Sequence, residues 1–147
     1  LVAVFDRYTG KNKAFGFARG ACLKEGAVAT TYAHDHHNLM VLGHSRKDML
    51  LAANQVIEIQ GGMVAVANEK RIAEIPLPVA GILSDLPLAE VANQMKEFKK
   101  ALEDLGWEHH NPIMSLGTLS LPVSPALKIS DQGLIDVREG KIISLFV

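Results

Sequence analysis

Short apolar runs separated by glycine-rich or polar segments make up much of this chain, a pattern typical of β-strands joined by turns. Two of these runs are separated only by Asn68, Glu69 and Lys70, which predicts a β-hairpin with a short loop. Residues 76–83 follow as an extended link, because their prolines are excluded from central strands. The strands predicted in this way cover residues 1–5, 27–33, 39–43, 63–67, 71–75 and 141–147.

Two segments show the spacing of apolar positions that is typical of amphipathic helices. The first begins at Ser45, where Asp48 completes a start signal resembling a capping box, and it ends at Gly61. The second begins at Pro87 and ends at Gly106, with Ser84 favoured as its N-cap. We expect both apolar stripes to lie in the core: Met49, Ala52, Ala53, Val56 and Ile57 in the first helix, and Leu88, Val91, Ala92, Met95, Phe98, Leu102 and Leu105 in the second.

The last forty residues lack such periodicity. Gly117, Pro122 and Pro125 interrupt their apolar stretches, so we expect irregular structure with at most one short helix, followed by a turn at residues 130–133. Together these elements predict the α+β class: a single domain with a mixed β-sheet, two long amphipathic helices and a β-hairpin. Parallel strand pairs would make the class α/β instead.

Composition narrows the range of partners. Of the 147 residues 48% are hydrophobic and 21% charged, which predicts some apolar surface facing another domain or subunit. A net charge of -1 argues against nucleic acid, and the absence of a long apolar run argues against a membrane span. Cys22 is the only cysteine, so we expect a buried thiol in a reducing, cytoplasmic compartment. The apolar start at Leu1, without an initiator methionine, predicts the middle of a larger polypeptide.

The polar insert His34-Asp35-His36-His37-Asn38 separates two predicted strands, and rigid neighbours of this kind position functional groups. Metal binding is one interpretation, since His34 and His36 on a continued strand would present two imidazoles to one ion, with Asp35 or His37 as a further ligand. Five consecutive residues cannot surround a tetrahedral ion. The remaining ligands would have to come from the other histidines, His44, His109 and His110.

Two other interpretations of the insert stay open. In general acid–base chemistry, Asp35 would orient a histidine whose ordinary pKa lies near neutrality. In a purely structural role, His34 and Asn38 would cap a turn while His36 and His37 are solvated. The sequence contains neither a phosphate-binding glycine loop nor a Gly-x-Ser-x-Gly nucleophile motif.

Sequence blocks along nearly the whole chain resemble the C-terminal domain of bacterial adenine deaminases, which belong to the amidohydrolase superfamily. His34, Asp35, His37 and Asn38 match the family's His-Asp-Ser-His-Asn motif, and His36 replaces its serine. The blocks occur in the family's order. They comprise residues 23–29, 33–39, 48–49, 61–64, 77–84 and 121–137.

The resemblance implies an enzyme that converts adenine and water to hypoxanthine and ammonia. Its divalent metal ions, manganese or iron, would be bound by a (β/α)8 barrel upstream of this domain, so residues 1–147 would be a fragment with no metal of its own. By the same resemblance, His34, Asp35 and His37 are implied to be catalytic, and Asn38 and Arg7 to bind substrate. The loop that carries the motif would line or close the active site of the barrel.

Departures from the family's pattern keep other functions open. Besides the change at position 36, Arg7-Tyr8 stands where the family has Arg-His, and Ala21-Cys22 where it has Phe-Gly. One alternative is a non-catalytic packing or oligomerisation domain of an amidohydrolase with another substrate; another is a self-contained metal-binding module. The expected partners are a purine substrate and the upstream barrel, with homo-oligomerisation open, and neither nucleic acid nor membrane.

Overall fold

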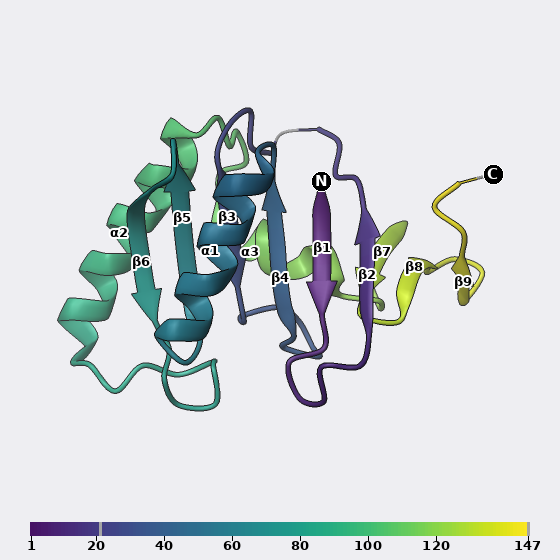
Figure 1. The fold of residues 1–147 in the computed structure, drawn as a ribbon, viewed down its shortest axis with the longest axis horizontal. Coiled ribbons are helices and arrows are strands. Elements are labelled where there is room, and N and C mark those ends of the chain that lie inside the picture. The colour runs from purple at the N-terminus through teal and green to yellow at the C-terminus, as the bar shows by residue number, and fades with distance from the viewer. Residues whose placement is uncertain (21, 147) are drawn as a thin grey trace.

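The computed structural model describes residues 1–20 and 22–146. A six-stranded antiparallel sheet, in the order β2-β1-β4-β3-β5-β6, forms its centre, and a three-stranded sheet follows near the C-terminus (Figure 1). The strands are β1 (Val2–Phe5), β2 (Lys13–Gly16), β3 (Ala27–Thr30), β4 (Leu39–Gly43), β5 (Gly62–Ala67), β6 (Lys70–Pro76), β7 (Leu127–Ser130), β8 (Gly133–Asp136) and β9 (Lys141–Ile143). The helices are α1 (Arg46–Glu58), α2 (Leu88–Asp104), α3 (Pro112–Gly117) and the short 3-10 helix η1 (Thr118–Ser120).

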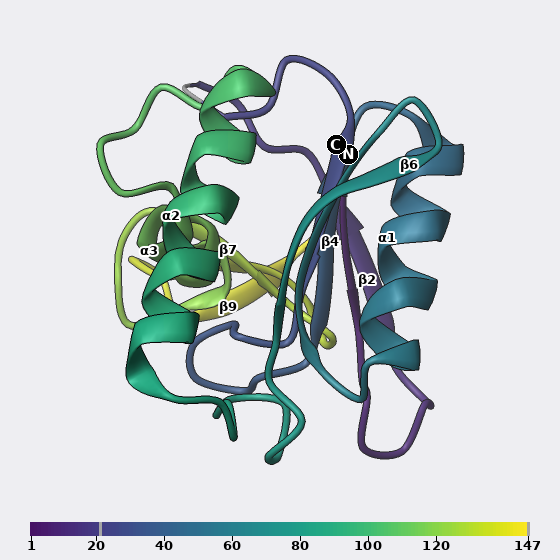
Figure 2. The same cartoon turned by 90° about the vertical axis from the view of Figure 1, so that its left-hand side faces the viewer.

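The elements form three layers. Seen along the edge of the large sheet in Figure 2, α1 lies on one side, and α2, α3 and the small sheet lie on the other. The expected α+β class is confirmed, and every strand pair among the described residues is antiparallel, so the α/β alternative is wrong.

The central strands are buried on both faces of the large sheet. In β3, Val28 faces the α2 side, whereas Ala27 and Ala29 face α1. In β5, Met63 and Val64 divide between the two faces in the same way. Because neither face of these strands meets solvent, their sequences are continuous apolar runs instead of alternating ones.

Helix α1 is confirmed, and the hairpin holds its start in place. Ser45 caps the helix by accepting a hydrogen bond from the backbone nitrogen of Asp48. The buried carboxylate of Asp48 in turn accepts one from the backbone nitrogen of Glu69, at 2.8 Å, in the turn of the predicted β5–β6 hairpin. The apolar stripe extends less far than expected, since Ile57 is exposed.

Helix α2 is also confirmed, but its stripe is only partly core. Phe98 and Leu102 are fully buried, whereas Leu88 and Met95 are 86% and 44% exposed. The helix packs mainly over the edge strand β6, so its N-terminal turns extend past the sheet (Figure 1). Ser84 does not cap the helix as expected; its hydroxyl accepts a hydrogen bond from the Leu86 backbone nitrogen, and Pro87 is the N-cap.

Three strands were missing from the prediction. β2 is a four-residue edge strand ending in glycine, and β7 and β8 form a short hairpin around the predicted turn at residues 130–133. The strand predicted at 27–33 ends at Thr30, and the last strand covers only residues 141–143. In the described part of the chain, no helix has the length and apolarity to cross a membrane.

Candidate functional site

The His34–Asn38 insert forms a turn between β3 and β4. The chain leaves the sheet after Thr30, and the backbone nitrogen of His37 donates to the carbonyl oxygen of Ala33 at 2.7 Å. Because the pleat does not continue, the expectation that His34 and His36 share one strand face is wrong. The geometry that would have offered one ion two strand imidazoles is therefore absent from this turn.

Arg7 holds the backbone of this turn. Its Nε donates to the carbonyl oxygen of His37, and its Nη2 donates to that of Ala80 at 2.6 Å. The neighbouring Tyr8 hydroxyl donates to the carbonyl oxygen of His36 at 3.0 Å. A guanidinium offers several fixed donors in one plane, so one side chain connects the motif to the segment after β6.

Asn38 fixes the end of the turn. Only 3% exposed, its side-chain oxygen accepts from the backbone nitrogen of Arg7 at 3.2 Å. Its Nδ2 donates to the Asp131 carboxylate at 2.9 Å. Asp131 also accepts hydrogen bonds from Asn12 and Gln132, at 3.4 and 2.6 Å. This carboxylate lies in the β7–β8 turn, 93 residues from Asn38, and the sequence predicts only a turn for its segment.

The His36 side chain is half-buried, so the expectation that it is solvated is wrong. Its Nδ1 accepts a hydrogen bond from the backbone nitrogen of Asn38 at 3.0 Å, and its Nε2 is enclosed without a hydrogen-bond partner. Burial lowers the pKa of His36, and the nearby Asp131 carboxylate opposes this effect only in part. The neutral imidazole is therefore favoured near neutral pH.

His34 and His37 turn toward Tyr32. The Tyr32 ring centroid lies 4.8 Å from that of His34 and 6.0 Å from that of His37, and the two imidazoles are 5.7 Å apart. The backbone of His34 is held by Gly117 and Ser120, at 3.0 and 3.1 Å. His37 Nδ1 is enclosed without a hydrogen-bond partner, so the expectation that this side chain is solvated is wrong as well. Asp35 is exposed at the tip of the turn.

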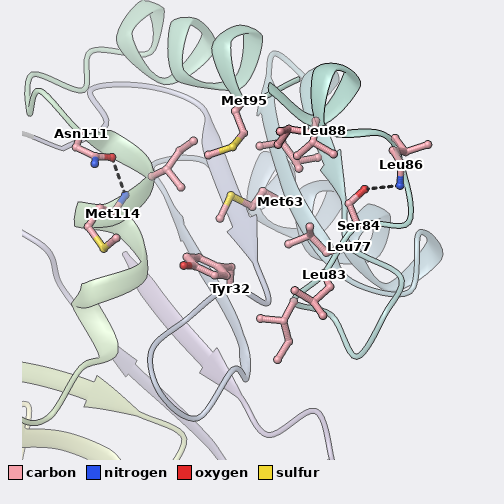
Figure 3. Close-up of a pocket in the computed structure, with 14 residues that line it drawn as sticks. Tyr32, Met63, Leu77, Leu83, Ser84, Leu86, Leu88, Met95, Asn111 and Met114 are labelled. Carbon is pink, nitrogen blue, oxygen red and sulfur yellow. Dashed lines mark hydrogen bonds between the residues drawn. The ribbon is translucent and has the colours of Figure 1, made fainter. Parts of the chain in front are cut away.

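Tyr32 also forms one wall of an apolar cleft of about 490 Å³ (Figure 3). In Figure 3, Met63 and Met95 lie above Tyr32, with Met114 on one side and Leu83 on the other. Met95, assigned to the core from its spacing, lines this cleft instead. The sequence does not predict the cleft, because its walls come from the segment after β3, from β5, β6, α2 and α3, and from the link before α2.

The other histidines are not available to complete a metal site beside the motif. His44 lies between β4 and α1, where its Nε2 is hydrogen-bonded to the carbonyl oxygen of Leu23 at 2.8 Å. His109 and His110 are exposed after α2, as expected. Among residues 1–20 and 22–146, no three His, Cys, Asp or Glu side chains form a group that could hold a metal ion.

The profile of one family, described as adenine deaminase C-terminal domain, matches residues 1–141. The chain belongs to this family. Its relatives include an adenine deaminase of Clostridium perfringens, 55% identical over 99% of this chain, and an adenine deaminase 2 of Shouchella clausii, 57% identical over all of it. An adenine deaminase of Thermosipho melanesiensis is 45% identical over 99% of the chain. The chain spans only about a quarter of the length of these relatives, 25–26%.

Two of the departures from the family's pattern meet in the structure. The Tyr8 hydroxyl donates to the backbone of His36, so both positions belong to the same support of the motif turn. Of the third departure, Ala21-Cys22, the structure describes only Cys22, because Ala21 lies outside the described residues. Cys22 is partly buried and packs against the core on the α2 side.

Proposed function

We propose that the intact protein is a metal-dependent adenine deaminase, in which this domain packs against an upstream (β/α)8 barrel. Support comes from membership of the adenine deaminase C-terminal domain family and from the names of relatives that extend well beyond this chain. The bound metal would activate a water molecule for attack on the ring carbon that carries the amino group. The proposal places that metal, manganese or iron, in the barrel, because the donors among residues 1–20 and 22–146 do not form a ligand set. It also takes the enzyme to be cytoplasmic.

In this proposal the motif turn faces the active site of the barrel. The observation that supports this orientation is that the backbone of the turn is held by hydrogen bonds, whereas some of its side chains reach solvent. Arg7, Tyr8 and Ser120 hold backbone carbonyls of the turn, while the side chain of Asp35 is exposed and that of His34 is only half-buried. A fixed backbone that presents ionisable side chains suits substrate orientation and proton transfer.

His34, Asp35 and His37 are the proposed catalytic residues, and Asn38 and Arg7 the proposed substrate-binding residues. In the domain as described, Asn38 uses both ends of its amide on protein groups, and Arg7 binds two carbonyls. Their first role is therefore to hold the turn. Direct contact of either one with the substrate stays a prediction.

A second candidate function is a packing or oligomerisation domain of an amidohydrolase with another substrate. The exposed apolar residues around the cleft, Leu83 and Leu88 among them, favour this candidate. The two candidates differ in what the motif contributes. Only the first requires turnover of adenine to depend on the side chains of the turn.

Substitution of the motif in the intact protein tests the proposal. His34→Ala, Asp35→Ala and His37→Ala should each lower the turnover of adenine about 10 to 100-fold and leave the metal content unchanged, because losses of supporting groups around a metal centre commonly have this size. His109→Ala, in an exposed loop, is the matched control and should keep full turnover. Loss of metal in step with activity would make the turn a ligand, and unchanged activity would favour the packing function.

A further inference from the structure

Helix α1 covers only part of its face of the large sheet. It packs on β3, β4 and β5, and Figure 1 shows β1 and β2 standing beside it without a covering element. The uncovered strands present aromatic side chains on this face: Phe5 and Phe15 meet edge to face, with ring centroids 6.1 Å apart. Phe15 is 46% exposed, so its ring adds to the apolar surface of this face.

A groove runs between α1 and these strands. It consists of two adjoining cavities, of about 510 and 420 Å³, which share Phe5, Leu50 and Ala53. Leu50 is 64% exposed on the flank of α1, and Ile57 continues the apolar wall toward the end of the helix. We call this feature the α1–β1 groove.

We propose that the α1–β1 groove binds the polypeptide that precedes Leu1 in the intact protein. The family is that of a C-terminal domain, and the relatives are about four times as long as this chain, so most of their length precedes it. Leu1 itself lines the groove, and its nitrogen donates to the carbonyl oxygen of Gly43 at 2.9 Å. In our proposal, a segment attached to Leu1 would start at a residue that lines the groove. This inference rests on the proposed upstream domain.

The covalent connection at Leu1 favours the preceding polypeptide over a second copy of the chain as the occupant of the groove. A covalently attached segment meets the groove at an effective concentration in the millimolar range, so modest apolar burial is enough for stable docking. A second copy of the chain would lack this advantage. The charged residues of the lining belong to one cavity each: Arg46 lines the cavity that contains Leu1, and Asp6 and Arg7 line the other. The residues that the two cavities share, Phe5, Leu50 and Ala53, are apolar, so this part of the groove suits an apolar segment.

A segment docked in the groove would also be linked to the motif turn through Arg7. Arg7 lines the groove and donates to the carbonyl oxygens of His37 and Ala80. A segment bound in the groove would thus contact the same side chain that holds the motif turn. The position of the upstream polypeptide and the position of the motif would be set by one contact.

Photo-crosslinking in the intact protein tests this assignment. A benzoylphenylalanine at position 50, in place of the exposed Leu50, should form crosslinks to residues preceding Leu1, identified by mass spectrometry. In a mixture of isotopically labelled and unlabelled protein, these crosslinks should join residues of the same label. The control carries the same group in place of Ile142, an apolar side chain of β9 that is 61% exposed, and should form few such crosslinks.

Three results would overturn the proposal: crosslinks that join labelled to unlabelled chains, which would assign the groove to a second copy; crosslinks of equal yield from both positions; or no crosslink from position 50. None of these readouts depends on turnover. The docking proposal can therefore fail while the proposed activity stands, and the converse also holds.

Discussion

The side-chain amide of Asn38 donates to the carboxylate of Asp131 across 2.9 Å, joining the motif turn to the β7–β8 turn. The two residues are 93 positions apart, and one of them is almost completely buried. This contact makes the C-terminal hairpin part of the candidate site, although the hairpin carries none of the motif residues.

Removal of this carboxylate should loosen the motif turn. Asp131→Ala leaves the buried Nδ2 of Asn38 without an acceptor, which should lower the free energy of unfolding by about 1–3 kcal/mol. Urea unfolding of the two proteins measures the difference. Gln132→Ala is the control, because Gln132 binds the same carboxylate from an exposed position and should have little effect. Equal stability of Asp131→Ala and the parent would contradict a supporting role.

His36 should make stability depend on pH. Burial lowers the pKa of His36 below the ordinary value of 6.5. His37 lowers it further, whereas Asp131, the backbone of Ile129 and Asp35 raise it only in part, so the unfolded chain binds the proton more readily than the folded chain. The contribution is complete above about pH 6.5 and is lost as the pH falls through that value toward the lowered pKa of the folded protein.

The variant His36→Ser isolates this effect. Near pH 7.5 the variant should be about as stable as the parent, since a serine hydroxyl also accepts from a backbone nitrogen two residues on. Between about pH 7 and pH 5, urea unfolding should show a smaller loss of stability in the variant than in the parent. Parallel curves for the two proteins would contradict the assignment.

The core under α2 should depend strongly on one ring. Phe98 is fully buried, so Phe98→Ala should lower the free energy of unfolding by about 3–5 kcal/mol. Met95→Ala, one turn earlier and 44% exposed in the cleft, should cost much less. Urea unfolding compares them directly. Similar losses from both substitutions would mean that the cleft is closed around Met95 in solution.

Arg7 should control the mobility of the motif turn. Arg7→Lys replaces a planar fork of donors with a single ammonium, which cannot reproduce the two bonds to the carbonyls of His37 and Ala80. Amide hydrogen exchange at His37, whose nitrogen donates to Ala33, should become faster. Arg19→Lys is the control, at an exposed position, and should leave the exchange rate unchanged. Unaltered exchange in Arg7→Lys would mean that the conformation of the motif turn does not depend on the hydrogen bonds of Arg7.

Local patterns accounted for much of this fold. The capping group at Ser45, the spacing of Phe98 and Leu102 and the hairpin around Asn68 each depend on residues close in sequence, so α1, α2 and β5–β6 were predicted correctly. The motif was found for a similar reason, since its five polar residues interrupt two apolar runs.

Only the tertiary structure decided which side chains of distant elements come into contact. The partnership of Asn38 with Asp131, the reach of Arg7 to His37 and Ala80, and the exposure of Met95 in a cleft all depend on how distant segments pack. Periodicity specifies the face of a helix on which a residue lies, but not whether a neighbouring element covers that face. The sequence by itself therefore determined the family, the main elements and the motif, whereas packing determined the support of the motif turn, the cleft beside it and the open groove along α1.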